Sequence, residues 1–241
     1  MSKLLGIALL TGLLVVFGIY GYNKWFAKAS GSDISIAKDS AESLNVNIDF
    51  GIGDLLIHGN SPEWVSGDLT YNHKKLEPKV KYKVRNDVGF VDIKQGSKVS
   101  FGFNNRKVQS DWDLQLTNDI PIDLNVDMGV SNSTLKLAGL QLNSLSIDSG
   151  VSDTLIDMSG DWKKGFQADM DLGVGDVTII LPKQTGVRVK ASKGIGRVAL
   201  PPGFITQKEN VYVNEAFAGA DVIIDISLDI GVGDVKFRTE E

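Results

Sequence analysis

The stretch ADMDLGVGDVTIIL, residues 168–181, contains two short apolar segments joined by Gly-x-Gly-Asp. Apolar residues recur at every second position from Met170 to Val174 and again from Val177 to Leu181, which is the period of a β-strand with one buried face. The step from Val174 to Val177 is odd, so one face stays inward only if the chain bends between them. Gly175 and Asp176 therefore form a predicted corner, where glycine allows unusual backbone angles and the aspartate side chain accepts hydrogen bonds from backbone N–H groups.

The same phrase recurs along the chain. Copies span 47–58, 125–137, 145–158, 168–181, 189–200 and 225–237, with a degenerate copy around Val88-Gly89-Phe90. The first glycines of the middle copies, at 129, 150, 173 and 194, are 21, 23 and 21 residues apart, and the wider gaps of 38, 40 and 37 residues each predict one irregular coil. A unit this short cannot bury its own apolar face, so the units must stack. We predict an all-β parallel β-helix or solenoid of about 21-residue coils, with an antiparallel roll or sandwich as the main alternative.

A long apolar run precedes the repeats. Leu4 to Tyr22 are 19 residues without a charge, and a helix of that length just spans a hydrocarbon core of roughly 30 Å. We predict one N-terminal transmembrane helix within 1–29, with a cleaved signal peptide ending near Ala27-Lys28-Ala29 as the alternative. Residues 30–43 are expected to form a polar tether. Residues 44–241 are expected to form the β-solenoid, with irregular coils over 44–118 and regular repeats over 119–241.

Composition excludes several classes of function. The chain has no cysteine and two histidines, which removes disulfide scaffolds, thiol catalysis and cysteine-based zinc sites. Without Lys3, Lys24 and Lys28, the 25 basic residues become 22 against 30 acidic ones, a net charge of −8 after the apolar run. An acidic domain lacks the electrostatic footprint of a nucleic-acid-binding protein. We expect no cofactor, and we place the cysteine-free, β-rich domain outside the cytoplasm.

The repeated corner suggests a calcium site. Asp148 and Asp171 precede the first glycine of their copies, while Asp153 and Asp176 follow the corner. Stacked coils would align these carboxylates into rows of the hard oxygen ligands that calcium favours. The simpler interpretation is corner capping, and it is preferred because Asn132 and Arg197 stand at the aspartate position in two copies.

One strand is basic. Lys79, Lys81, Lys83 and Arg85 alternate with Val80, Tyr82 and Val84. In an otherwise acidic domain, the cationic face is a candidate contact for an anionic wall polymer, lipid headgroups or an acidic partner. The alternatives are a solvated surface or charges that block edge pairing at the end of the stack, and these are the simpler interpretation.

The Asp-x-Gly-x-Gly-Asp corners, clearest at 171–176 and 229–234, resemble the toast-rack or LiaF-like C-terminal β domains of bacterial cell-wall-active antibiotic response proteins. The resemblance covers about residues 44–241 and extends to β-solenoids described as candidate adhesins. It implies a membrane-facing solenoid linked to envelope stress, with no catalytic residues. LiaF-like proteins carry several N-terminal membrane helices, whereas this chain has one apolar run, so a single-pass companion or adhesin-like protein fits better than direct inhibition of a sensor kinase.

We therefore expect a non-enzymatic, membrane-anchored, extracytoplasmic binding or regulatory component of the bacterial cell envelope. Its expected partners are a membrane protein or a cell-wall polymer, and not nucleic acid. The alternative is a structural solenoid that assembles end to end through its terminal strand edges. An enzyme is the least favoured reading, because the sequence places no nucleophile beside a base.

Overall fold

The computed structural model describes residues 30–96 and 108–240, and these residues form β-strands with two short 3₁₀ helices. The all-β prediction is confirmed. Within the described ranges, no helix has the length and apolar character needed to cross a membrane. The predicted anchor or signal peptide, residues 1–29, lies outside the described residues.

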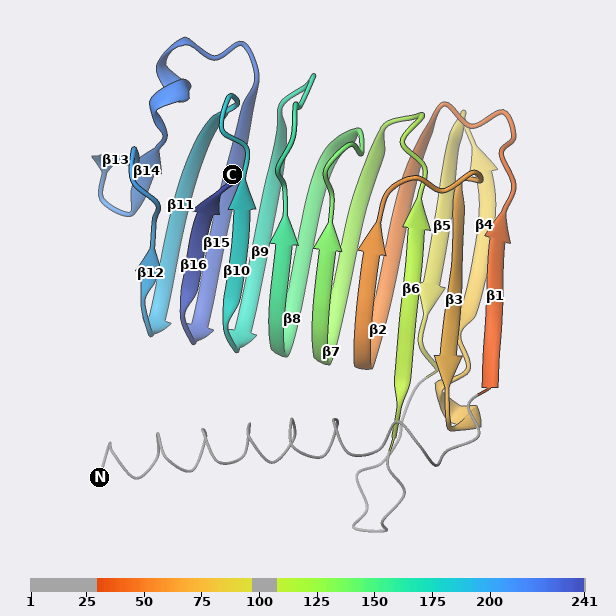
Figure 1. Ribbon diagram of the computed structural model, residues 1–241. Coiled ribbons are helices and arrows are strands. Elements are labelled where there is room, and N and C mark those ends of the chain that lie inside the picture. Colours follow the sequence, from red (N-terminus) through yellow and green to blue (C-terminus); the bar gives the residue numbers. More distant parts are fainter. Residues whose placement is uncertain (1–29, 97–107, 241) are drawn as a thin grey trace, which may run out of the picture.

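The repeats build a stack of coils with two layers of strands, and each coil crosses from one layer to the other at a corner (Figure 1). Three long strands run through both layers, while the other coils consist of two shorter strands. The long strands are β2 (Ser43–His58), β7 (Ile122–Lys136) and β8 (Leu142–Asp157). The paired shorter strands are β9 (Phe166–Val174) with β10 (Val177–Leu181), β11 (Gly186–Ile195) with β12 (Val198–Ala199), and β15 (Ile223–Val232) with β16 (Val235–Thr239).

Neighbouring coils pair in parallel, but their order in space differs from their order in sequence. The last coil, β15 with β16, lies between the coil of β9 and β10 and the coil of β11 and β12. Backbone hydrogen bonds across the corners confirm this order: the Gly175 N–H donates to Val232 O, and the Gly233 N–H donates to Ile195 O. At the other end, β2 lies between β7 and a split coil of β5 (Val88–Lys94) and β6 (Ser110–Leu116).

Antiparallel strands cover both ends of the stack. At the N-terminal end, β4 (Lys79–Arg85) pairs with β5, β3 (Val65–Tyr71) pairs with β6, and β1 (Ser30–Ile36) pairs with β3. At the C-terminal end, β14 (Val211–Val213) pairs with β11 and β13 (Ile205–Lys208) pairs with β14. The 3₁₀ helix η1 (Lys74–Leu76) joins β3 to β4, and η2 (Glu215–Gly219) joins β14 to β15.

Three sequence predictions are wrong at the ends. Residues 30–43 are not a tether: β1 alternates polar and apolar residues, pairs with β3 over its whole length, and buries Ile36. Two of the wide gaps, between β2 and β5 and between β11 and β15, hold antiparallel strands in place of irregular coils. Gly89 is not a corner glycine, because it lies opposite Leu44 near the start of β5, seven residues before the position that aligns with Gly51.

The core lies between the two layers. Alternate residues of every coil point inward, and most of these side chains, such as Val46, Ile147 and Ile226, are at most 2 % exposed. Tilted aromatic pairs fill the wider places, with ring centroids 5.0 Å apart for Phe50 and Trp112 and 4.7 Å apart for Trp162 and Phe166. Period-2 alternation therefore predicted the inward face correctly.

The corners with the sequence Gly-x-Gly share one strained backbone conformation. Gly175, Gly196 and Gly233 have φ values of 146°, 143° and 149°, which L-residues with a side chain rarely adopt. A Cβ atom on Gly233 would lie 1.8 Å from the carbonyl oxygen of Gly175. In the Gly-x-Ser copies, Ser131 and Ser152 take this position without a positive φ, and β7 and β8 run through the corner without a break.

We expect Gly233→Ala to lower the free energy of unfolding by at least about 2 kcal/mol, because the strain and the backbone clash must move two neighbouring corners. Gly219→Ala is the matched control, since a Cβ atom there meets nothing within 4 Å, and we expect a change within about 0.5 kcal/mol. Urea unfolding followed by circular dichroism measures both. Equal stability of the two variants would contradict the close packing of the corners.

Candidate functional site

The aspartates that follow the corners form a ladder of hydrogen bonds. The Asp153 carboxylate accepts from the Asp176 N–H at 3.1 Å, and the Asp176 carboxylate accepts from the Asp234 N–H at 3.0 Å. The ladder ends at Arg197, whose N–H donates to Asp234 Oδ1 at 2.9 Å and whose guanidinium donates to Asp234 Oδ2 at 2.6 Å. The hydrogen bonds from Arg197 lower the pKa of Asp234. These carboxylates thus satisfy backbone donors of the next coil, as a corner cap does.

The aspartates that precede the corners form a second row on the opposite layer. Asp148 lies directly opposite Asp171 on β9 and Asp127 on β7, and Asp49 and Asp229 continue the row. Burial first, and then the charges of Asp49 and Asp148, raise the pKa of Asp127. The four calcium candidates therefore divide into two pairs, with Asp148 in a shallow hollow beside Asp127 and with Asp153 and Asp176 in a groove of the other layer. In the described residues, no three His, Asp or Glu side chains come together as a metal site would require.

The capping interpretation makes Asp176 a stability residue. We expect Asp176→Ala to lower the free energy of unfolding by about 1 kcal/mol through loss of the bond from the Asp234 N–H, while Asp176→Asn, which keeps an acceptor oxygen, loses less. Asp169→Ala, an exposed aspartate on β9, is the control. Thermal unfolding with and without millimolar calcium separates the interpretations: a calcium-dependent rise in Tm that Asp176→Asn abolishes would favour the metal site.

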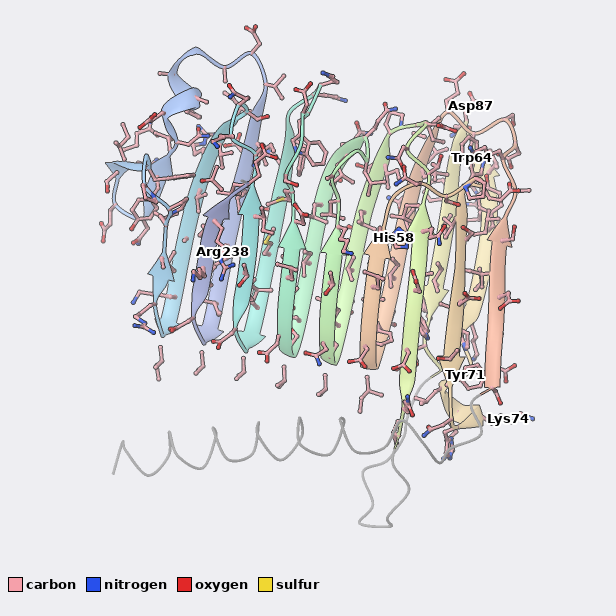
Figure 2. The ribbon with its side chains drawn as sticks, in the orientation of Figure 1. His58, Trp64, Tyr71, Lys74, Asp87 and Arg238 are labelled. Atoms are coloured by element: carbon pink, nitrogen blue, oxygen red, sulfur yellow. The ribbon has the colours of Figure 1, made fainter. Side chains whose placement is uncertain are left out.

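An open groove of about 1050 Å³ crosses the layer of β6, β2, β7, β8 and β10. Figure 2 shows His58 and Arg238 on this layer, on β2 and β16. The groove is lined by six carboxylates and two cations: Asp54, Asp68, Asp111, Asp113, Asp153 and Asp176, with Lys136 and Arg238. His58 Nε2 lies 3.0 Å from Asp113 Oδ1, so the one histidine near the groove is held by a carboxylate.

Three aspartates stand side by side at the N-terminal end of this layer. The sheet register places Asp33 on β1 opposite Asp68 on β3, and Asp68 opposite Asp113 on β6. Hydrogen bonding and repulsion from Asp33, with smaller contributions from burial and from Asp113, raise the pKa of Asp68. A raised pKa in the folded state means that the ionised carboxylate of Asp68 opposes folding. The stabilisation that protonated Asp68 gives the folded state is therefore fully present below the unfolded pKa of about 3.9, and it is lost as the pH rises through the folded-state pKa.

Asp68→Asn tests this repulsion. We expect the variant to be more stable than the wild type at pH 7, and the difference to shrink as the pH falls and wild-type Asp68 takes up its proton. Urea unfolding at pH 7 and pH 3.5 measures it, with Asp221→Asn, an exposed loop residue, as the control. A difference that grows toward low pH would have the wrong sign for three repelling carboxylates.

The predicted basic strand is β4, and it forms the outer edge of its layer at the N-terminal end. Lys79, Lys81, Lys83 and Arg85 are exposed, and within the described part of the chain none of them makes an ion pair. Lys81 lies opposite Asp92 on β5, and Lys83 Nζ is 5.7 Å from the ring centroid of Phe90. The structure thus brings all four predicted contact residues together on one open face.

A loop that the sequence did not single out holds β4 against the stack. Asp39 accepts hydrogen bonds from Trp64 Nε1 at 3.0 Å and from the Tyr82 hydroxyl at 2.9 Å. The bond from Trp64 is the largest of the effects that lower the pKa of Asp39, while burial, followed by the bond to Asp39, raises the pKa of Tyr82 to about 12. Trp64 is 5 % exposed and lies at the end of the stack that carries β1, β3 and β4 (Figure 2), so it closes the core.

Sequence reasoning missed the row of Asp33, Asp68 and Asp113. It also missed the hydrogen bonds that Trp64 and Tyr82 donate to Asp39. Both belong to strands and loops outside the repeated phrase. One signal was present: apolar residues alternate through 112–116, as they do in the repeats, whereas 30–36 offers only Ile34 and Ile36. Which of these strands become neighbours is a matter of tertiary pairing, and the sequence carries no motif for it.

Comparison with a solved structure agrees with this architecture. A solved structure of a candidate cell adhesion protein from Clostridium sporogenes superposes with a TM-score of 0.84 at 29 % identity, covering 88 % of this chain and all of that one. Two candidate adhesins, from Bacteroides fragilis and Parabacteroides distasonis, match with TM-scores of 0.32 and 0.28 at 13 % and 12 % identity. They cover 86 % and 88 % of this chain and 97 % and 98 % of their own.

No curated protein sequence matches the chain. The family model described as the N-terminal domain of toast_rack (DUF2154) matches residues 25–180, which is more than half of the chain. The matched range contains β1 to β9 and most of β10, including the corners at Gly53 and Gly175. The resemblance drawn from the Gly-x-Gly-Asp corners is thereby confirmed, and the chain belongs to the toast-rack family.

Proposed function

We propose that this toast-rack protein is a non-enzymatic, membrane-anchored component of the bacterial cell envelope that binds an acidic partner through β4. The observation that carries the proposal is the basic strand itself. In a domain with a net charge of −8 after residue 28, four cations stand together on one exposed edge. Such a concentration of one sign of charge steers and holds partners of the opposite sign.

The proposed membrane anchoring rests on the apolar N-terminal run. Leu4 to Tyr22 is long enough to span a bilayer as a helix, and β1 begins at Ser30 without the tether that we expected. Seven residues separate the two, and they reach at most about 25 Å when extended. β1 and β4 lie at the same end of the stack (Figure 1), so the anchor would hold the basic edge close to the membrane, on its outer side.

A binding role is favoured over catalysis because both histidines and the corner aspartates make hydrogen bonds within the fold. The corner aspartates accept backbone N–H groups, His58 is held by Asp113, and His73 Nδ1 accepts from the Lys75 N–H at the start of η1. The similarity to a candidate cell adhesion protein at 29 % identity supports an adhesin-like contact role. A role in the envelope-stress response is part of the same proposal and rests on the family resemblance.

Photocrosslinking in the cells that produce the protein tests the proposal. A photoreactive residue replaces Lys81 on β4, and a second chain carries it in place of Lys190, an exposed residue of β11 with strands on both sides. We expect crosslinks to an envelope protein from position 81 and not from position 190. Equal crosslinking from both positions would remove β4 as the contact, and crosslinks to further copies of the chain would favour end-to-end assembly.

A further inference from the structure

We propose that the outer edge of β4 takes up an extended, acidic segment of a partner protein, which adds to the layer as one more β-strand. This inference rests on the proposed function and names the chemistry and the binding mode of its partner. Its first support is the open edge: in the described residues β4 pairs with β5 alone. On its other side, alternate residues of an edge strand present N–H and C=O groups that can template a new strand.

The charges on β4 select an acidic strand. Lys79, Lys81 and Lys83 share the outward face with Phe90, Asp92 and Lys94 of β5, so one carboxylate of β5 stands beside this row. Side chains of an added strand would stand about 5 Å from the lysines, close enough for opposite charges to stabilise the pair and for like charges to oppose it. An incoming strand with carboxylates on its outward face therefore fits, and a basic one does not.

The other face of β4 adds a second requirement. Val80 and Val84 point toward the core side of the layer, yet they are 37 % and 36 % exposed because the stack ends at β4. A strand that placed apolar residues next to them would continue the core by one position. The partner segment should therefore alternate acidic and apolar residues, which is the counterpart of the pattern Lys-Val-Lys-Tyr-Lys-Val-Arg over 79–85.

This double requirement argues against the other anionic partners. A phosphate-rich wall polymer or a lipid headgroup can meet the four cations, but it has no amide edge to pair with β4 and no apolar residues spaced to cover Val80 and Val84. Among the described strands, the other open edges are β1, which carries Asp33 as its only charge, and β12 and β13 at the C-terminal end, which carry no carboxylate. A second copy of this chain therefore offers at most one carboxylate against four cations. An acidic strand of a different protein is the occupant that satisfies charge, backbone and apolar surface together.

The experiment measures binding of a fluorescent peptide of about seven residues that alternates glutamate and valine, a length matched to β4. The full chain is held in detergent, and fluorescence anisotropy reports binding. Two further peptides carry N-methyl groups on the glutamates or on the valines. Because alternate residues of a strand point their N–H groups to the same side, strand addition predicts that one set of N-methyl groups abolishes binding and the other does not. Inorganic polyphosphate and vesicles that contain an anionic phospholipid are the competing probes.

Charge reversal on the protein completes the design. We expect the double variant Lys81→Glu with Lys83→Glu to weaken peptide binding at least about tenfold, and Lys81→Gln with Lys83→Gln to weaken it less. The matched control reverses Lys190 and Lys236, which are exposed on β11 and β16, two strands with neighbours on both sides. We expect that control to bind as the wild type does. Equal thermal unfolding of the variants shows that each one is folded.

Three results would overturn the inference. If both N-methylated peptides bind equally well, the contact is electrostatic and no strand is added. If polyphosphate or vesicles bind in a way that depends on Lys81 and Lys83 while the peptide does not, strand addition is wrong but β4 remains an anion-binding contact, as the proposed function requires. Absence of binding by every probe also overturns strand addition, and crosslinking from position 81 then decides the proposed function separately.

Discussion

The backbone of each corner packs directly on the backbone of the next corner, and the rest of the stack follows from this contact. A Cβ atom on Gly175 would lie 1.8 Å from the carbonyl oxygen of Ser152, and one on Gly196 would lie 1.7 Å from that of Gly233. Glycine removes the atom that would separate the coils and also permits the positive φ of the bend. Because the corners of neighbouring coils are in register, inward and outward side chains align in rows that run across the stack.

Rows of identical residues bring identical charges together. In parallel strands about 4.8 Å apart, aspartates at the same position of neighbouring repeats become close neighbours. In the corner row each carboxylate of Asp153, Asp176 and Asp234 accepts a backbone N–H of the next coil, and Arg197 closes the row. Among the described residues no backbone N–H donates to Asp127, and burial, followed by the charges of Asp49 and Asp148, raises the pKa of that carboxyl. The same residue type is therefore stabilising at the corner and repulsive a few positions earlier.

The ends of the stack differ from its middle because a coil at the end has no neighbour on one side. The chain covers both ends with antiparallel strands and places its first and last coils one position inside. The C-terminal coil of β15 and β16 is thus held between two others and does not form an exposed edge. Among the described strands, β1 and β4 are open edges at the N-terminal end, and β4 is the one that combines exposed cations with half-covered valines. The coils in the middle of the stack satisfy the backbone hydrogen bonds of their strands on both sides, and the proposed contact with a partner is therefore placed at this end.

The sequence by itself determined the strands of the regular repeats, their inward face, their Gly-x-Gly and Gly-x-Ser corners and the family, because these depend on short-range patterns: period-2 alternation, an odd step and Gly-x-Gly-Asp. It also identified β4 as a basic strand from seven consecutive residues. Only the tertiary structure decided which coil lies next to which, since repeats with the same corner can pair with one another equally well. For the same reason the sequence could not show that β15 separates β9 from β11, that 30–36 is a strand, or that Asp33, Asp68 and Asp113 meet. These arrangements depend on pairing between distant segments, and such pairing is set by the packing of the whole stack.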